Sequence, residues 1–101
     1  MVKFGLWVEL VARAGRERDV AAFLADALPV VQQETGTVCW FGVRLDQATF
    51  AIFDAFESEE ARDIHLAGAV AEALADRAGD LLASPPEIRR LDVLAAKLSA
   101  R

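Results

Sequence analysis

Apolar and polar side chains alternate along the start of the chain. From Val2 to Ala12 every second residue is apolar, and the intervening positions also hold large apolar groups at Trp7 and Val11. Period-two spacing with β-branched and aromatic residues predicts a β-strand. Because both faces of this strand are apolar, we expect one face to be covered by helices of this chain and the other by a second sheet.

The hydrophobic period changes to that of an α-helix after Gly15. Apolar residues then recur in one stripe at i, i+3, i+4, i+7, i+8 and i+11, at Val20, Phe23, Leu24, Ala27, Leu28 and Val31. A stripe of this kind predicts an amphipathic helix whose charged residues face outward.

The rest of the chain repeats these two periods and completes a known order of elements. Three further strands and two helical pieces are predicted at Thr37–Arg44, Thr49–Phe56, Ser58 to about Leu66, Ala69 to about Ala83, and Glu87–Lys97. The order strand, helix, strand, strand, helix, strand predicts an α+β fold, the ferredoxin-like split βαβ plan (βαββαβ). In this plan a four-stranded antiparallel sheet carries helices on one face. With 101 residues, the chain is expected to form one domain, 1–101.

Composition and charge limit the classes of partner that this protein is expected to bind. Hydrophobic residues make up 54% of the chain, more than a lone small domain can cover, so we expect a homodimer through the open sheet face. The net charge of −5, with 11 basic residues scattered among 16 acids, argues against nucleic acid. The sequence has no run of about 18 apolar residues that would span a membrane. One cysteine, Cys39, and no signal-peptide pattern lead us to expect a cytoplasmic protein.

Two polar residues are expected to face inward. Asp54 shares one strand face with Phe50, Ile52 and Phe56, and His65 lies on an apolar stripe of the following helix. Our hypothesis is that Asp54 orients and charges His65, which then accepts a proton from a phenolic substrate. The alternative is a structural histidine that bonds to Asp54 or to a backbone carbonyl.

Aromatic residues and one arginine are the candidates for ligand binding. They are Trp7, Trp40, Phe41 and Phe53, which could stack a planar molecule, and Arg44, which could orient an acidic or phenolic oxygen. The alternatives are a core or dimer-interface role for the aromatics and a solvated Arg44. The sequence has no glycine-rich phosphate loop, no metal-ligand spacing and no Ser-His-Asp signature, so no cofactor and no metal are expected.

Three segments, AGRERD, FDAFESEEARDIHLAG and PPEIRRLDVLAAKL, resemble the antibiotic biosynthesis monooxygenase domain of the dimeric α+β barrel superfamily. The resemblance covers nearly the whole chain, and its most specific part is the set Asp54, Phe56, Ser58 and His65. It implies a homodimer with face-to-face sheets and a ligand pocket between helices and sheet. It also implies, as for some members, oxidation of phenolic, quinol or anthrone-like molecules by oxygen without metal or flavin.

The haem-degrading branch of the same fold is a poor match. Its members carry an asparagine on the first strand, a tryptophan on the helix after the third strand, and an iron-ligating histidine further along. The corresponding positions here hold Val8, His65 and Ala75. Haem breakdown is therefore not expected.

Two functions from different classes remain open. The first is a cofactor-independent monooxygenase acting on a planar phenolic, quinol or anthrone-like molecule, with His65 as proton acceptor. The alternative is a non-catalytic, small-molecule-binding or stress-related dimer with the same pocket. A pocket that contains both Asp54 and His65 would favour catalysis, whereas an interior filled with side chains would favour the alternative.

Overall fold

The computed structural model describes residues 1–99, so the last two residues of the predicted 1–101 domain lie outside the described part. The strands are β1 (Phe4–Val11), β2 (Thr37–Arg44), β3 (Thr49–Phe56) and β4 (Glu87–Asp92), and the helices are α1 (Glu17–Val31), α2 (Glu59–Leu66) and α3 (Ala69–Leu81). The strands form one sheet in the order β2-β3-β1-β4, with every neighbouring pair antiparallel. The predicted ferredoxin-like plan is confirmed, and the sheet is open rather than closed into a barrel.

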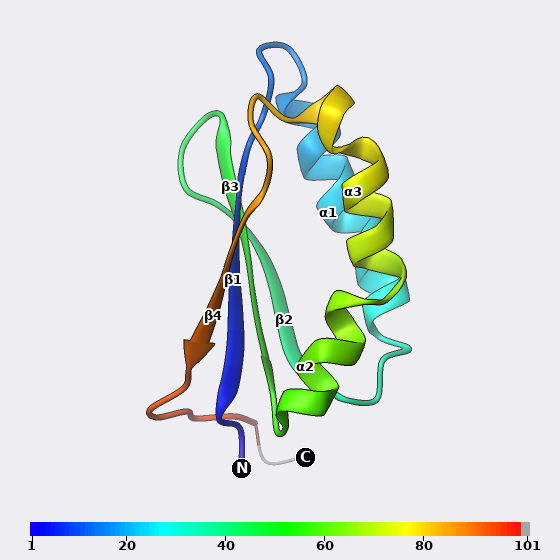
Figure 1. Ribbon diagram of the computed structural model, residues 1–101. Coiled ribbons are helices and arrows are strands. Elements are labelled where there is room, and N and C mark those ends of the chain that lie inside the picture. Colours follow the sequence, from blue (N-terminus) through cyan, green and yellow to red (C-terminus); the bar gives the residue numbers. More distant parts are fainter. Residues whose placement is uncertain (100–101) are drawn as a thin grey trace.

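All three helices cover the same face of the sheet (Figure 1). Antiparallel helices α1 and α3 run along it, and the short α2 lies at the end where β3 finishes. The core forms between these two layers, because the alternating apolar residues of β1 and β3 meet the helix stripes there. Its members are Val8, Leu10, Ala12, Val20, Leu24, Phe50, Ile52, Leu74, Leu81 and Leu82. None of the helices within residues 1–99 combines the length and apolar content needed to cross a membrane.

The sequence pattern predicted the bounds of β2 and β3 and the start of α2 correctly. Strands β2 and β3 have the predicted bounds. Ser58 begins α2 as its N-cap, with its hydroxyl accepting the N–H of Ala61 at 3.0 Å. This bond satisfies one of the backbone donors that a helix start leaves free.

The last strand is shorter than predicted. It was expected to reach Lys97 but ends at Asp92, and Leu94 is 95% exposed. The reason is the register, because Asp92 pairs with Phe4, the first residue of β1. After one more bond, from the N–H of Val93 to the carbonyl of Lys3 at 2.8 Å, no partner strand remains to extend the ladder.

A buried arginine connects α2 to the sheet through hydrogen bonds. Arg62 is only 5% exposed, and its guanidinium donates to the carbonyls of Gly5 at 3.2 Å and Leu91 at 3.3 Å. The same group lies over the ring of Phe4, 5.4 Å from its centre. These contacts join α2 to both β1 and β4, so they fix the helix that carries His65.

Candidate functional site

Asp54 is a fully buried carboxylate. It lies on the helix-facing side of β3, opposite Leu6 on β1 and Trp40 on β2, and its exposed fraction is 0%. Its Oδ2 lies 2.9 Å from Nε2 of His65 on α2. This contact is short but lacks hydrogen-bond geometry, and no donor within residues 1–99 makes a well-formed hydrogen bond to either carboxylate oxygen, so His65 compensates Asp54 by its charge. A buried carboxylate needs a compensating group, and His65 is placed to be that group.

A second carboxylate holds the other side of the same ring. Glu34, in the turn between α1 and β2, places Oε1 2.6 Å from Nδ1 of His65. The hydroxyl of Thr37 donates to the same Oε1 at 2.7 Å. We call the set Glu34, His65 and Asp54 the carboxylate clasp. It ties a turn, a helix and a strand together at one end of the molecule.

The clasp favours a charged histidine. Burial by itself lowers the pKa of His65, but hydrogen bonds and charges from Asp54 and Glu34 outweigh it and raise that pKa above its usual range. Burial also raises the pKa of Asp54, although His65 partly offsets this. An imidazolium ring can donate to both carboxylates at once. In that state neither ring nitrogen has a free lone pair with which to accept a proton.

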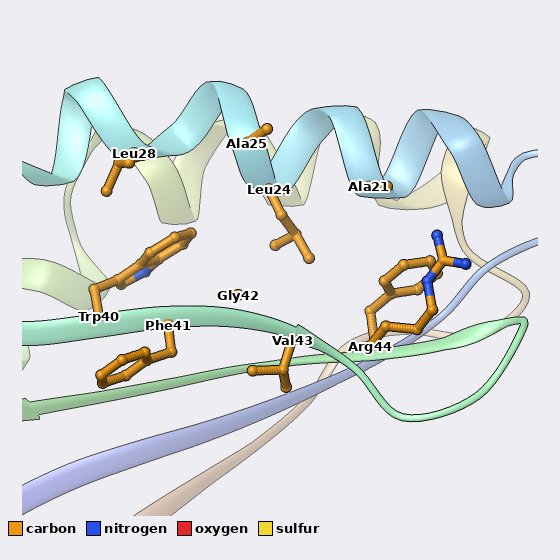
Figure 2. A pocket seen from close by; sticks show the side chains of 10 residues that line it. Ala21, Leu24, Ala25, Leu28, Trp40, Phe41, Gly42, Val43 and Arg44 are labelled. Carbon is orange, nitrogen blue, oxygen red and sulfur yellow. The ribbon is translucent and has the colours of Figure 1, made fainter.

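A separate cleft opens between α1 and the edge strand β2 (Figure 2). Its volume is about 420 Å³, and it is lined by Ala21, Leu24, Ala25, Leu28, Trp40, Phe41, Gly42, Val43, Arg44 and Phe50. The indole of Trp40 points toward Leu28 and forms one end wall. Gly42 forms part of the floor, where a Cβ would lie 3.2 Å from Cβ of Leu24. The close approach of helix and strand at this point therefore depends on a residue without a side chain.

Arg44 stands at the other end of this cleft. Its guanidinium lies over the ring of Phe50, 5.0 Å from the centre. Figure 2 shows the group rising from β2 toward Ala21 on α1. The cleft thus has an aromatic wall at one end and a positive charge at the other.

The sheet separates the five residues predicted to bind substrate. Trp40 and Arg44 face α1, whereas Phe41 points to the opposite side (Figure 2). Phe53 pairs in register with Phe41 on one side and with Trp7 on the other, across that same helix-free face, and the rings of Phe41 and Phe53 stack 6.5 Å apart. The single aromatic pocket expected from sequence is therefore not formed within one chain. Side chains of neighbouring strand residues point to opposite faces, so Trp40 and Phe41 both border the cleft but present their rings to opposite sides of the sheet.

The clasp and the cleft are also separate. Neither Asp54 nor His65 lines the cleft. His65 and Glu34 instead border a groove of about 350 Å³ between α2 and the turn before β2, and Asp54 lies beneath it. Within residues 1–99, no three His, Cys, Asp or Glu side chains are arranged to hold a metal ion.

Sequence reasoning missed Glu34 and the floor of the cleft. Glu34 could not be found from periodicity, because it lies in a turn and meets His65 only through the tertiary fold. Gly42 did carry a signal. A glycine inside an otherwise apolar strand indicates the close approach of another element.

Comparison with solved structures identifies several similar chains. A protein of unknown function from Nitrosomonas europaea is 46% identical, with a TM-score of 0.98 over 100% of this chain and 98% of that one. A second protein from the same organism, named as a candidate antibiotic biosynthesis monooxygenase, is 14% identical, with a TM-score of 0.81 over 91% of this chain and 90% of that one. A protein of the same name from Bordetella bronchiseptica is 17% identical, with a TM-score of 0.75 over 94% and 100% of the two chains. No protein-family model and no curated protein sequence matches the chain.

Proposed function

We propose that this protein binds and oxidises a planar aromatic molecule. The premise is that the chain belongs to one family with the 46%-identical Nitrosomonas europaea protein and has the fold of antibiotic biosynthesis monooxygenases. The substrate class is phenolic, quinol or anthrone-like, and molecular oxygen is the oxidant. The reaction needs neither a metal nor an organic cofactor. The cleft between α1 and β2 holds the ligand.

The observation that supports this proposal is the shape and lining of the cleft. Its volume of about 420 Å³ lies within the range of small-molecule sites, roughly 300–1,000 Å³. Its lining residues are aliphatic or glycine apart from Trp40, Phe41, Phe50 and Arg44. An indole wall favours a flat ring system, because aromatic faces stack in offset arrangements.

His65 is the proposed proton acceptor, and two conditions go with that role. Because neither Asp54 nor His65 lines the cleft, the substrate must extend past Trp40, which pairs with Asp54 in the sheet, to bring a hydroxyl to His65. Both ring nitrogens have carboxylate partners and the ring is charged, so the proton on Nδ1 must leave with one partner before His65 can accept a proton from the substrate. Glu34 is the partner that can leave, because its side chain is 20% exposed whereas that of Asp54 is buried. Asp54 then keeps the ring oriented and offsets its new charge. The deprotonated, electron-rich substrate is the species that reacts with oxygen.

Oxygen uptake with a panel of quinols and anthrones tests the proposal. Two variants separate its parts: His65→Gln removes the acceptor, and Ala25→Phe fills the cleft from an exposed helix position. Ala22→Phe, an exposed position on the side of α1 that faces α3 rather than β2, is the matched control for added bulk. We expect the first two to lose turnover and the control to keep it. If folded His65→Gln consumes oxygen as fast as the parent, the proton-acceptor role is wrong.

A second candidate function is non-catalytic binding of the same class of molecule. It is favoured by one observation, that neither the cleft nor the groove beside α2 is lined by both Asp54 and His65. Under this alternative the clasp only holds the fold together. Ligand binding that Ala25→Phe abolishes, without oxygen uptake by the parent on any panel member, would favour it.

We further propose that the chain forms a homodimer through the helix-free sheet face. Aromatic side chains gather there at Trp7, Phe41 and Phe53, and Phe41 is 54% exposed. A second copy of the same face would remove this apolar surface from water. Analytical ultracentrifugation at micromolar concentration should give a dimer for the parent and a larger monomer fraction for Phe41→Lys. A monomeric parent would contradict the proposal.

A further inference from the structure

Arg44 is the only charged residue among those that line the cleft. The remaining side chains are aliphatic or aromatic. Arg44 is exposed and can be solvated by water, so a ligand that fills the cleft gains most where it places a polar or charged group near that guanidinium.

Arg44 also differs from most of the other described arginines in what holds it, although Arg13 and Arg18 likewise have no carboxylate partner. Arg16, Arg62, Arg77, Arg89 and Arg90 each have a carboxylate within 4.0 Å. Within residues 1–99, no carboxylate comes that close to Arg44. Its guanidinium is held instead by the face of Phe50, 5.0 Å away. Stacking on a ring orients the planar group while leaving its N–H donors free.

The nearest acid along the chain is already engaged. Asp46 accepts the backbone N–H groups of Ala48 at 3.1 Å and Thr49 at 2.9 Å. These bonds close the turn between β2 and β3. The side chain of Thr49, followed by the two backbone N–H groups, lowers the pKa of Asp46. Asp46, the carboxylate nearest to Arg44 in sequence, is therefore hydrogen-bonded within the turn instead of pairing with Arg44.

We propose that Arg44 recognises an ionised oxygen, so that the preferred ligand of the cleft is a planar aromatic anion. The rings lie along Trp40, and the anionic oxygen lies at the guanidinium. A carboxylate and a phenolate share this chemistry, and a carboxylate gains more because it can accept two parallel N–H bonds. This inference rests on the proposed function, since it assumes that the cleft is the ligand site.

Isothermal titration calorimetry with three probes tests the inference. The probes are 2-naphthoate, 2-naphthol at neutral and alkaline pH, and the neutral 2-naphthylmethanol. We expect the parent to bind 2-naphthoate roughly ten- to a hundredfold more tightly than the alcohol, as for hydrogen bonds to a charged partner. Tightening of 2-naphthol binding at alkaline pH would support phenolate as a further source of the anion.

Three variants separate charge from packing. Arg44→Gln should abolish the preference for the anion while leaving the affinity for 2-naphthylmethanol within a few-fold. Arg44→Lys should keep part of the preference, because the charge remains but the two-pronged geometry is lost. Arg89→Gln, on the strand at the far edge of the sheet, is the matched control and should leave the preference unchanged.

The outcomes distinguish this inference from the proposed function. Equal affinity of the parent for 2-naphthoate and 2-naphthylmethanol overturns the anion preference but leaves the cleft as the ligand site. A preference that survives Arg44→Gln overturns the role of Arg44 alone. If no probe binds the parent, or if Ala25→Phe binds them as tightly as the parent does, the cleft itself is wrong and both proposals fail.

Discussion

Replacing His65 by leucine should destabilise the protein strongly, by an amount that depends on pH. Leucine fills a similar volume but donates to neither carboxylate. Asp54 would remain fully buried with no compensating group, while Glu34 could turn toward solvent. The main cost therefore arises at Asp54.

The geometry sets the size of the effect. Unit charges 2.9 Å apart, as for Nε2 of His65 and Oδ2 of Asp54, attract each other by about 6 kcal/mol at an effective dielectric constant of about 20. Desolvation cancels part of this attraction, and breaking a buried pair from one side costs about 3 to 5 kcal/mol. For a domain of this size, about 3 kcal/mol corresponds to a fall in Tm of at least about 12 °C.

The direction of the pH effect follows from the protons that each state binds. The pKa of His65 is raised in the folded protein, so between about 6.5 and that raised value the native state holds more protons than the unfolded chain. Stability therefore falls as pH rises through this window. The raised pKa of Asp54 acts in the same direction at lower pH. In His65→Leu, Asp54 can relieve its burial by keeping its proton in acid.

Urea unfolding followed by tryptophan emission at pH 5, 7 and 9, at one protein concentration, measures these effects. The difference between parent and His65→Leu should be largest near pH 7. It should shrink in acid, where Asp54 is protonated, and in alkali, where the parent loses its imidazolium. The double variant Asp54→Leu/His65→Leu should regain most of the loss. A cost below about 1 kcal/mol at pH 7, or one that does not vary with pH, would refute the account of the clasp as a buried ion pair.

Four further variants test the packing and anchoring of α2 and α3. Gly79→Ala should stabilise the protein by about 0.5–1 kcal/mol, because Gly79 lies in α3 and no atom would lie within 4 Å of the added Cβ. Gly36→Ala should destabilise it, because the added Cβ would lie 2.9 Å from the Cβ of Ala61. Thermal unfolding decides both, and equal shifts would contradict the steric argument. Arg62→Met should lower stability by about 2 kcal/mol through two lost charged hydrogen bonds, while Arg90→Met, which breaks only an exposed pair, should cost less than about 1 kcal/mol. Similar costs for the two would show that the buried contacts to the sheet carbonyls contribute little.

Local periodicity was sufficient to predict the architecture. The alternation in β2 and β3, the stripe on α1 and the cap at Ser58 are each encoded within a few neighbouring residues. The pairing of Asp54 with His65 could also be predicted from the sequence. A strand face and the helix that follows it lie close together when the connection is short.

Contacts between distant segments could not be obtained in this way. Glu34 reaches His65 across 31 positions, and only the packing of the turn before β2 against α2 brings them together. The end of β4 was set by where its partner strand begins, not by its own apolar residues.

The division of the predicted aromatic pocket has the same origin. The sequence by itself determined which residues are aromatic and which strands carry them. The tertiary structure decided which side of the sheet received helices, and so left Trp40 and Arg44 in a cleft and Trp7, Phe41 and Phe53 on the open face. The physical reason is that strand alternation assigns side chains to two faces, whereas the choice of the face that is covered depends on the helices packing across the whole sheet.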